Sequence, residues 1–151
     1  MSEREAPPLN RMAIAVLSMA GLFVALYLLA NKLGLTGPLV CGVGECATVQ
    51  ASEWSQIGPV PVSAFGVGGY VALLVVSLYG LQPVGMQSRA VSAILLAFST
   101  VALAFSAWLT YLEAFVIHAW CQWCVISAIL VTLIFLAALP EARRLREWSD
   151  A

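Results

Sequence analysis

Four long stretches of the chain are hydrophobic and contain no formally charged residue, at 12–30, 62–81, 90–112 and 114–139. A helix needs about 20 apolar residues to cross the hydrocarbon core of a bilayer. The pattern therefore predicts an all-α protein, a bundle of four transmembrane helices at about 12–30, 62–81, 90–112 and 120–139. The first stretch is longer than the hydrophobic region of a secretory signal, so we interpret it as an uncleaved span.

Polar segments lie before, between and after these helices. They predict a lead at 1–11, an outer loop at 31–61 and a tail at 140–151. Within the loop, 47–57 places Val49, Trp54 and Ile57 on one side of a helix, which predicts a short amphipathic helix on the outer membrane surface. The prolines of "GPVPVS" end it. The third and fourth helices follow so closely that they form a hairpin, and the fourth is expected to end at Pro140.

Composition and charge fix the class of protein and its orientation. The chain is 62% hydrophobic and 10% charged, whereas soluble domains are about half apolar and a quarter charged. Seven basic residues are too few for a nucleic-acid surface. If both termini share one side, all the arginines lie there, namely Arg4, Arg11, Arg89, Arg143, Arg144 and Arg146. Only Lys32 then lies opposite, so both termini are expected in the cytoplasm.

The four cysteines form two close pairs on the predicted outer side. Cys41 and Cys46 lie in the outer loop, and Cys121 and Cys124 lie where the fourth helix begins. The second pair shares one helix face, and the N–H groups of the first turn favour a thiolate, which we expect at Cys124. Disulfides persist on this side of a membrane.

Three interpretations of the cysteines remain open at this point. Their spacing is tolerable for a zinc site, and they could form structural disulfides without catalysis. The third interpretation is an electron relay by thiol–disulfide exchange between the two pairs. Such a relay needs an aqueous partner at the loop pair and a lipid-soluble acceptor at the helix pair, which a membrane quinone would supply.

The chain resembles the bacterial vitamin K epoxide reductase (VKOR) family in two stretches. These are "CGVGECATVQASEWSQIGPVPVSAFGVGGY" and "YLEAFVIHAWCQWCVIS". The resemblance extends from about Gly21 to Leu139 and is that of a stand-alone form without a fused thioredoxin-like domain. A second family of four-helix quinone reductases has the two kinds of cysteine pair in the opposite order.

The resemblance implies a quinone-dependent thiol–disulfide oxidoreductase in the bacterial inner membrane, with its active site facing the periplasm or cell exterior. Cys41 would exchange with a separate thioredoxin-fold protein, and Cys46 would attack Cys121. Cys124 would meet the quinone, either ubiquinone or menaquinone, with a vitamin K-type quinone as an alternative. Ser52 is similar to a family serine that holds the loop near the site.

Reduction of vitamin K quinone or epoxide is a second physiological role that the resemblance allows. The animal enzymes, however, have a tyrosine four residues after the second active-site cysteine, where this chain has Ala128. The hydrogen bond of that tyrosine to a quinone is therefore missing.

Further residues are candidates for the quinone site, each with an ordinary structural alternative. Glu113 would carry a proton during quinone reduction or extend to water at the outer interface. His118 has the same two interpretations. The remaining candidates would wall the pocket or simply pack between helices, namely Trp54, Phe65, Gly66, Gly69 and Tyr111.

Overall fold

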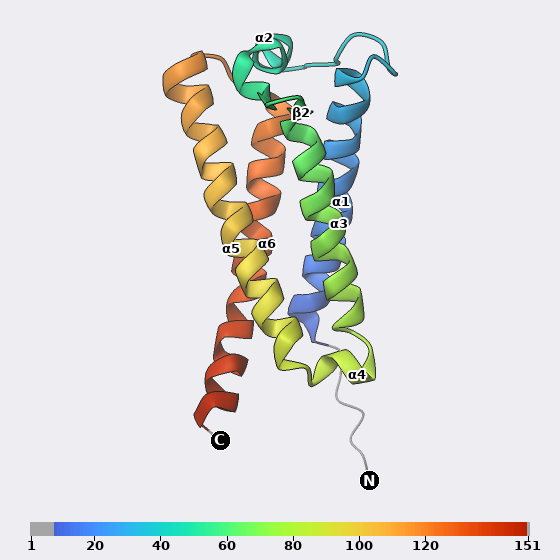
Figure 1. The fold of residues 1–151 in the computed structure, drawn as a ribbon, viewed down its shortest axis with the longest axis vertical. Helices are drawn as coiled ribbons and strands as arrows, with labels where there is room; N and C mark the ends of the chain where they lie inside the picture. Colours follow the sequence, from blue (N-terminus) through green and yellow to red (C-terminus); the bar gives the residue numbers. More distant parts are fainter. Residues whose placement is uncertain (1–7, 151) are drawn as a thin grey trace.

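The computed structural model describes residues 8–150 and consists almost entirely of helices (Figure 1). The elements, in chain order, are α1 (Leu9–Lys32), α2 (Cys46–Ala51), the 3₁₀ turn η1 (Glu53–Ser55), β1 (Gln56–Ile57), β2 (Val60–Pro61), α3 (Val62–Tyr79), α4 (Pro83–Met86), α5 (Arg89–Leu112), the π-helical turn η2 (Glu113–Ile117) and α6 (Gln122–Asp150). Residues 1–7 of the expected N-terminal lead, with Arg4, lie outside the described residues, as does Ala151.

Four of these helices are long and apolar enough to cross a membrane. They are α1, α3, the continuous segment Arg89–Ile117 and α6, so the predicted four-helix membrane bundle is confirmed. In Figure 1, α1 lies beside α3 and α5 beside α6, and α1 also packs against α6. The contact between α3 and α5 is much less extensive, which leaves the bundle more open on that side.

The predicted loop helix forms, but it is shorter than the sequence pattern indicates. α2 ends at Ala51, and the chain continues through η1 into a two-stranded antiparallel hairpin of β1 and β2. Val49 is buried, whereas Trp54 and Ile57 are largely exposed and belong to other elements. The expected apolar stripe over 47–57 was therefore wrong, because the backbone leaves the helical conformation at Ser52.

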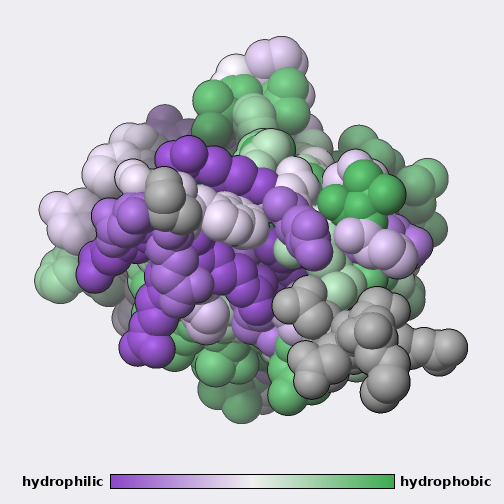
Figure 2. All heavy atoms as spheres, turned by 90° about the horizontal axis from the view of Figure 1, so that it is seen from below, coloured by the Kyte–Doolittle hydropathy of each residue, from purple (hydrophilic) through white to green (hydrophobic). Residues whose placement is uncertain are grey.

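The fourth helix continues beyond the point at which the sequence suggested that it ends. α6 includes Pro140 and extends to Asp150. A helix of 29 residues is about 43 Å long, which exceeds the roughly 30 Å of a bilayer core. Figure 2 shows the end of the molecule that carries both termini, where hydrophilic residues gather in the middle and hydrophobic residues surround them.

A buried ion pair joins the helices at this end. Arg11 of α1 and Glu141 of α6 both have fully buried side chains, and two nitrogens of the guanidinium each donate to a carboxylate oxygen at 2.9 Å. Arg11 also donates to the carbonyl oxygens of Gly80 and Gly85, after α3 and in α4, and to Ser92 of α5. One guanidinium thus contacts groups from all four membrane helices or their connections, which holds the bundle together at the end opposite α2.

Candidate functional site

The cysteine loop carries the first part of the site. Cys41 and Cys46 form a disulfide, with their Cα atoms 6.0 Å apart. Cys46 is the first residue of α2 and is 1% exposed, whereas Cys41 is partly exposed. The two sulfurs of this disulfide therefore face different environments, one the solvent and the other the protein interior.

The loop is attached to the chain just before α6 by its backbone. The N–H of Glu45 donates to the carbonyl oxygen of Trp120 at 2.7 Å, and Gly44 pairs with Cys121 as an antiparallel bridge. Gly44 has a φ of 95°, and a Cβ there would meet the Trp120 oxygen at 2.4 Å. Only glycine fits both the backbone conformation and the close approach, which explains one of the two glycines between Cys41 and Cys46.

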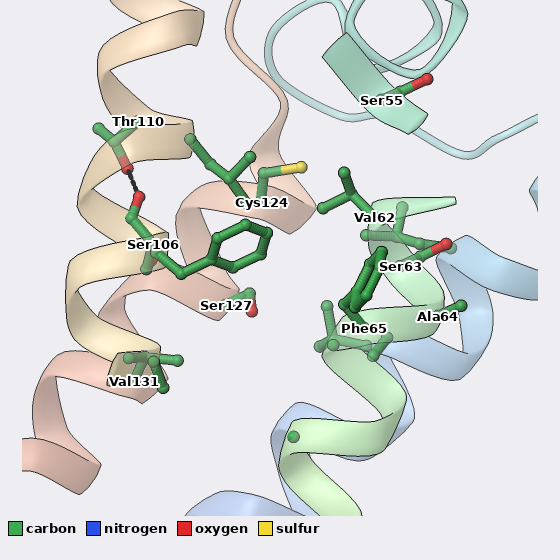
Figure 3. Close-up of a pocket in the computed structure, with 18 of the residues that line it drawn as sticks. Ser55, Val62, Ser63, Ala64, Phe65, Ser106, Thr110, Cys124, Ser127 and Val131 are labelled. Atoms are coloured by element: carbon green, nitrogen blue, oxygen red, sulfur yellow. Dashed lines mark hydrogen bonds between the residues drawn. The ribbon is translucent and has the colours of Figure 1, made fainter. Parts of the chain in front are cut away.

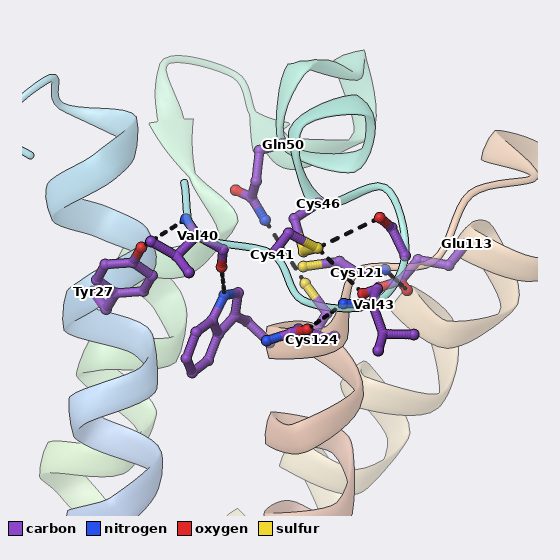
Figure 4. The surroundings of a disulfide bond; sticks show 12 residues. Tyr27, Val40, Cys41, Val43, Cys46, Gln50, Glu113, Cys121 and Cys124 are labelled. Carbon is purple, nitrogen blue, oxygen red and sulfur yellow. Dashed lines mark hydrogen bonds between the residues drawn. A yellow bond between two sulfur atoms is a disulfide. The ribbon is translucent and has the colours of Figure 1, made fainter. Parts of the chain in front are cut away.

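Both residues between Cys121 and Cys124 also hold the loop. The side-chain oxygen of Gln122 accepts from the N–H of Val43 at 2.7 Å, and the indole N–H of Trp123 donates to the carbonyl oxygen of Val40 at 2.7 Å. Figure 4 shows these bonds beside the disulfide, with the free cysteines directly below it. The Cys-x-x-Cys segment therefore positions the loop pair as well as carrying two thiols.

The second pair is reduced and differs in burial. Cys121 lies immediately before α6 and is 0% exposed, and Cys124 in the first turn is partly exposed. Hydrogen bonding, first by the Cys124 thiol and then by the N–H groups of Cys124 and Trp123, outweighs burial and lowers the pKa of Cys121. These N–H groups therefore favour a thiolate at Cys121, and a Cys124 thiolate stabilised by the first turn of α6 stays a prediction.

The two pairs meet in one buried cluster. Cys46 and Cys121 pack together there with Val49 and Ala119, and Cys41 and Cys124 lie at its margin. Sulfurs from a loop and a membrane helix are thus gathered at the end of the bundle that carries α2. Thiol–disulfide exchange requires this proximity, because a thiolate attacks the sulfur of a neighbouring disulfide directly.

A cavity of about 660 Å³ begins beside Cys124 and continues into the bundle. Its walls come from α1, α3, α5, α6 and the segment from Val49 to Ile57. Figure 3 shows the Cys124 sulfur at this space, with Phe65 of α3 opposite Ser106 of α5. The lining is mostly apolar, and binding sites for small molecules usually have this volume and character. Cys121 is not part of the wall.

The model of the vitamin K epoxide reductase (VKOR) family matches residues 12–139, which is most of the chain. The chain belongs to this family. Membership identifies the protein as a membrane oxidoreductase, and the match contains the four membrane-crossing segments for most of their length, together with all four cysteines. The resemblance noted in the two cysteine-containing stretches is thereby confirmed.

Most residues predicted from the sequence for the quinone site lie on the cavity wall. These are Cys124, Ser52, Trp54, Phe65, Gly66, Gly69 and Glu113. A Cβ added at Gly69 would meet no atom within 4 Å, so this glycine leaves space in the cavity instead of bringing helices together.

Tyr111 does not line the cavity. It is 50% exposed and packs between Trp108 and Phe115, with ring centroids 5.9 Å and 5.1 Å away. The two residues that follow it, Leu112 and Glu113, are buried and line the cavity. Neighbouring residues on a helix point in different directions, which explains why Tyr111 lies outside while Glu113 lies inside.

Glu113 is 5% exposed, so it does not extend to water at the outer interface. Its Oε2 accepts from the N–H of Cys121 at 3.2 Å, and η2 begins at Glu113 itself. His118 is exposed at the hairpin tip in the left-handed region, with a φ of 55°. Of the two proposed proton carriers, only Glu113 contacts the cysteine segment and the cavity.

Sequence reasoning missed a tyrosine–serine pair in the cavity wall. The hydroxyl groups of Tyr70 and Ser127 lie 2.7 Å apart, and Tyr70 is 4% exposed. Gly21 of α1 permits this burial, because a Cβ there would meet the Tyr70 ring at 2.1 Å. The spacing offered a signal, since Ser127 follows Cys124 by three positions and therefore shares its helix face.

Proposed function

We propose that this VKOR-family protein oxidises the thiols of a separate thioredoxin-fold protein and passes the electrons to a membrane quinone. The main support for this proposal is the difference in environment among the four sulfurs. Cys41 is partly exposed, Cys46 and Cys121 share a buried cluster, and Cys124 faces the cavity. Electrons would follow the same order. The physiological result would be disulfide formation in exported proteins.

The first exchange begins at the loop. A thiolate of the partner attacks Cys41 and breaks the Cys41–Cys46 bond, and the second partner thiol then displaces Cys41, which leaves the partner oxidised and the loop pair reduced. The partial exposure of Cys41 supports this direction of attack. Cys46 is 1% exposed, so it is shielded from a large partner.

The second exchange transfers the electrons to the helix pair. With Cys121–Cys124 as a disulfide, the Cys46 thiolate attacks Cys121 and Cys124 leaves as a thiolate. Cys41 then attacks Cys46, which re-forms the loop disulfide and releases Cys121. A thiol of lower pKa is a better leaving group, and the lowered pKa of Cys121 supports this last step. The structure has the resulting arrangement, a loop disulfide and two helix thiols.

The cavity fits a quinone ring in size and chemistry. Apolar side chains from α3 and α5 wall it, and the polar groups are few, with Cys124 at the outer end and the Tyr70–Ser127 pair deeper in. A quinone bound there would accept two electrons and two protons as the Cys121–Cys124 disulfide re-forms. Glu113 would hold and transfer one proton beside Cys121 and Cys124, because its carboxylate is buried at the cavity wall.

Ser52 would keep the loop over the cavity. Its hydroxyl donates to the carbonyl oxygen of Val49 at 2.7 Å at the end of α2. This bond satisfies a terminal helix carbonyl and supports the bend at which Trp54 reaches the cavity wall.

A Cys41→Ser variant should accumulate a Cys46–Cys121 disulfide. Cys46 still attacks Cys121 in this variant, but the residue that resolves the mixed disulfide is missing. Peptide mapping under non-reducing conditions would identify the bond after purification with quinone. Cys46→Ser is the matched control and should yield no such product. A Cys46–Cys124 bond in its place would contradict the proposed order of the sulfurs.

The cysteine end should face the periplasm or cell exterior, with both termini in the cytoplasm. Six of the seven basic residues then lie inside. A membrane-impermeant maleimide should label Cys41 in intact cells after mild reduction. Gln87 is exposed near α4 at the opposite end, so a Gln87→Cys substitution in a chain without other cysteines should be labelled only after permeabilisation. The reverse pattern would overturn the orientation.

A further inference from the structure

The sulfur of Cys124 has a hydrogen-bond donor that comes from the loop. The side-chain amide of Gln50, in α2, donates to Cys124 Sγ at 3.7 Å. Both side chains line the same cavity, and Figure 4 shows Gln50 extending from α2 toward the thiol.

Lys32 fixes the backbone from which this amide extends. It is the last residue of α1, and its ammonium donates to the carbonyl oxygen of Gln50 and, at 2.9 Å, to Ser55 Oγ. Ser55 Oγ also donates to the Gln50 oxygen, at 2.7 Å. The carbonyl oxygen at the end of α2 thus receives two donors. Among the described residues, Lys32 is the only lysine or arginine on the cysteine side of the bundle.

We infer that Gln50 is a further catalytic residue, which stabilises negative charge on Cys124 through its amide N–H, and that Lys32 is its positioning residue. The inference rests on the proposed role of Cys124 as the sulfur that faces the quinone. When Cys46 attacks Cys121, the Cys46–Cys121 bond forms, the Cys121–Cys124 bond breaks and the electron pair goes to Cys124. Gln50 donates a hydrogen bond to that sulfur and transfers no proton.

The charged groups around Cys124 disfavour a thiolate there, so a hydrogen-bond donor has a large effect on it. Among the described residues, the titratable groups that face it are Cys121 and Glu113, and each opposes a second negative charge when it is itself ionised. Lys32 carries a positive charge in this network, but it contacts the Gln50 backbone and not the sulfur. The Gln50 amide is therefore the side-chain group that favours a thiolate at Cys124 directly.

The test measures Cys124 alone, without a quinone. In the full chain with Cys121→Ser and the loop disulfide intact, Cys124 is the single free thiol of the four cysteines. Its rate of alkylation by iodoacetamide at neutral pH and its ultraviolet thiolate absorption both report the thiolate. Gln50→Met keeps the length of the side chain but removes the donor, so the alkylation rate should fall about tenfold. Gln50→Lys retains a donor and should keep or exceed the original rate.

Control variants separate donation from packing. Gln56 is an exposed glutamine of β1 that does not line the cavity, and Gln56→Met should leave the rate unchanged. Lys32→Met should reduce the rate several-fold, and Lys32→Arg should restore it. An unchanged rate in Gln50→Met, or equal losses in Gln50→Met and Gln50→Lys, would overturn the inference about Gln50. An unchanged rate in Lys32→Met would overturn the role of Lys32.

This experiment also stands apart from the proposed function. If quinone reduction proved not to depend on Cys124, the alkylation series would still report whether Gln50 stabilises its thiolate. The converse result, with Cys124 essential and Gln50→Met without effect, would leave the relay in place and remove Gln50 from it.

Discussion

A Cys124→Ser variant should lose quinone reduction by more than about a thousandfold, because Cys124 faces the cavity and its sulfur is the one proposed to pass electrons to the quinone. The loop disulfide does not involve Cys124, so its exchange with a small dithiol should continue. Two assays measure these activities separately in purified protein. One follows quinone absorbance with a dithiol as the reductant, and the other follows reduction and reoxidation of the Cys41–Cys46 pair.

Cys121→Ser provides the matched comparison. Turnover should also stop, because the helix disulfide cannot form, but Cys124 remains at the cavity wall as a free thiol. With added ubiquinone or menaquinone, its thiolate should therefore produce a visible charge-transfer absorption, which disappears when Cys124 is replaced as well. An absorption that survives the loss of Cys124, or one that requires Cys121, would assign the quinone to the other sulfur.

The fold was largely predictable because a bilayer restricts what a sequence can form. Long uncharged stretches have few structures open to them other than membrane helices, and four such helices are present. The loop was less predictable, since its conformation depends on contacts with distant segments. The apolar positions after Val49 suggested one helix, yet the chain leaves the helical conformation at Ser52. Nearby, Ser55 accepts a hydrogen bond from Lys32, and Gln50 donates one to Cys124.

The candidate site shows the same contrast. Residues beside a cysteine motif or in a glycine-rich helix start were found, and Ser52, Phe65 and Gly69 do line the cavity. Gln50 and Tyr70 were missed because nothing in their local spacing indicates a partner on another helix. Tyr111 was proposed from its type and its place near the C-terminal end of α5. The direction of a single helix position depends on the partners of that helix, which the local sequence does not give.

The buried ion pair at the other end of the molecule gives the second large expectation. Glu141→Ala should destabilise the protein by about 3–5 kcal/mol, because the guanidinium of Arg11 would remain fully buried without its carboxylate. Unfolding in detergent micelles measures this loss. Glu147 is an exposed acidic residue on the same helix, and Glu147→Ala should change the free energy of unfolding by no more than about 0.5 kcal/mol.

Replacing both partners distinguishes the net contribution of the ion pair to stability from the free energy lost when one charge is left buried alone. Exchanging Arg11 for methionine and Glu141 for leucine removes both charges together, and apolar side chains often replace such a pair with little loss of stability. The double variant should therefore be more stable than Glu141→Ala, although Arg11 also donates to Gly80 and Gly85, whose carbonyl oxygens would lose a donor. Equal stability of Glu141→Ala and Glu147→Ala would contradict this account. The pair lies at the opposite end from the cysteines, so the Cys41–Cys46 exchange should keep its rate in every folded variant. That result would separate an ion pair that holds the helices together from a residue of the proposed electron relay.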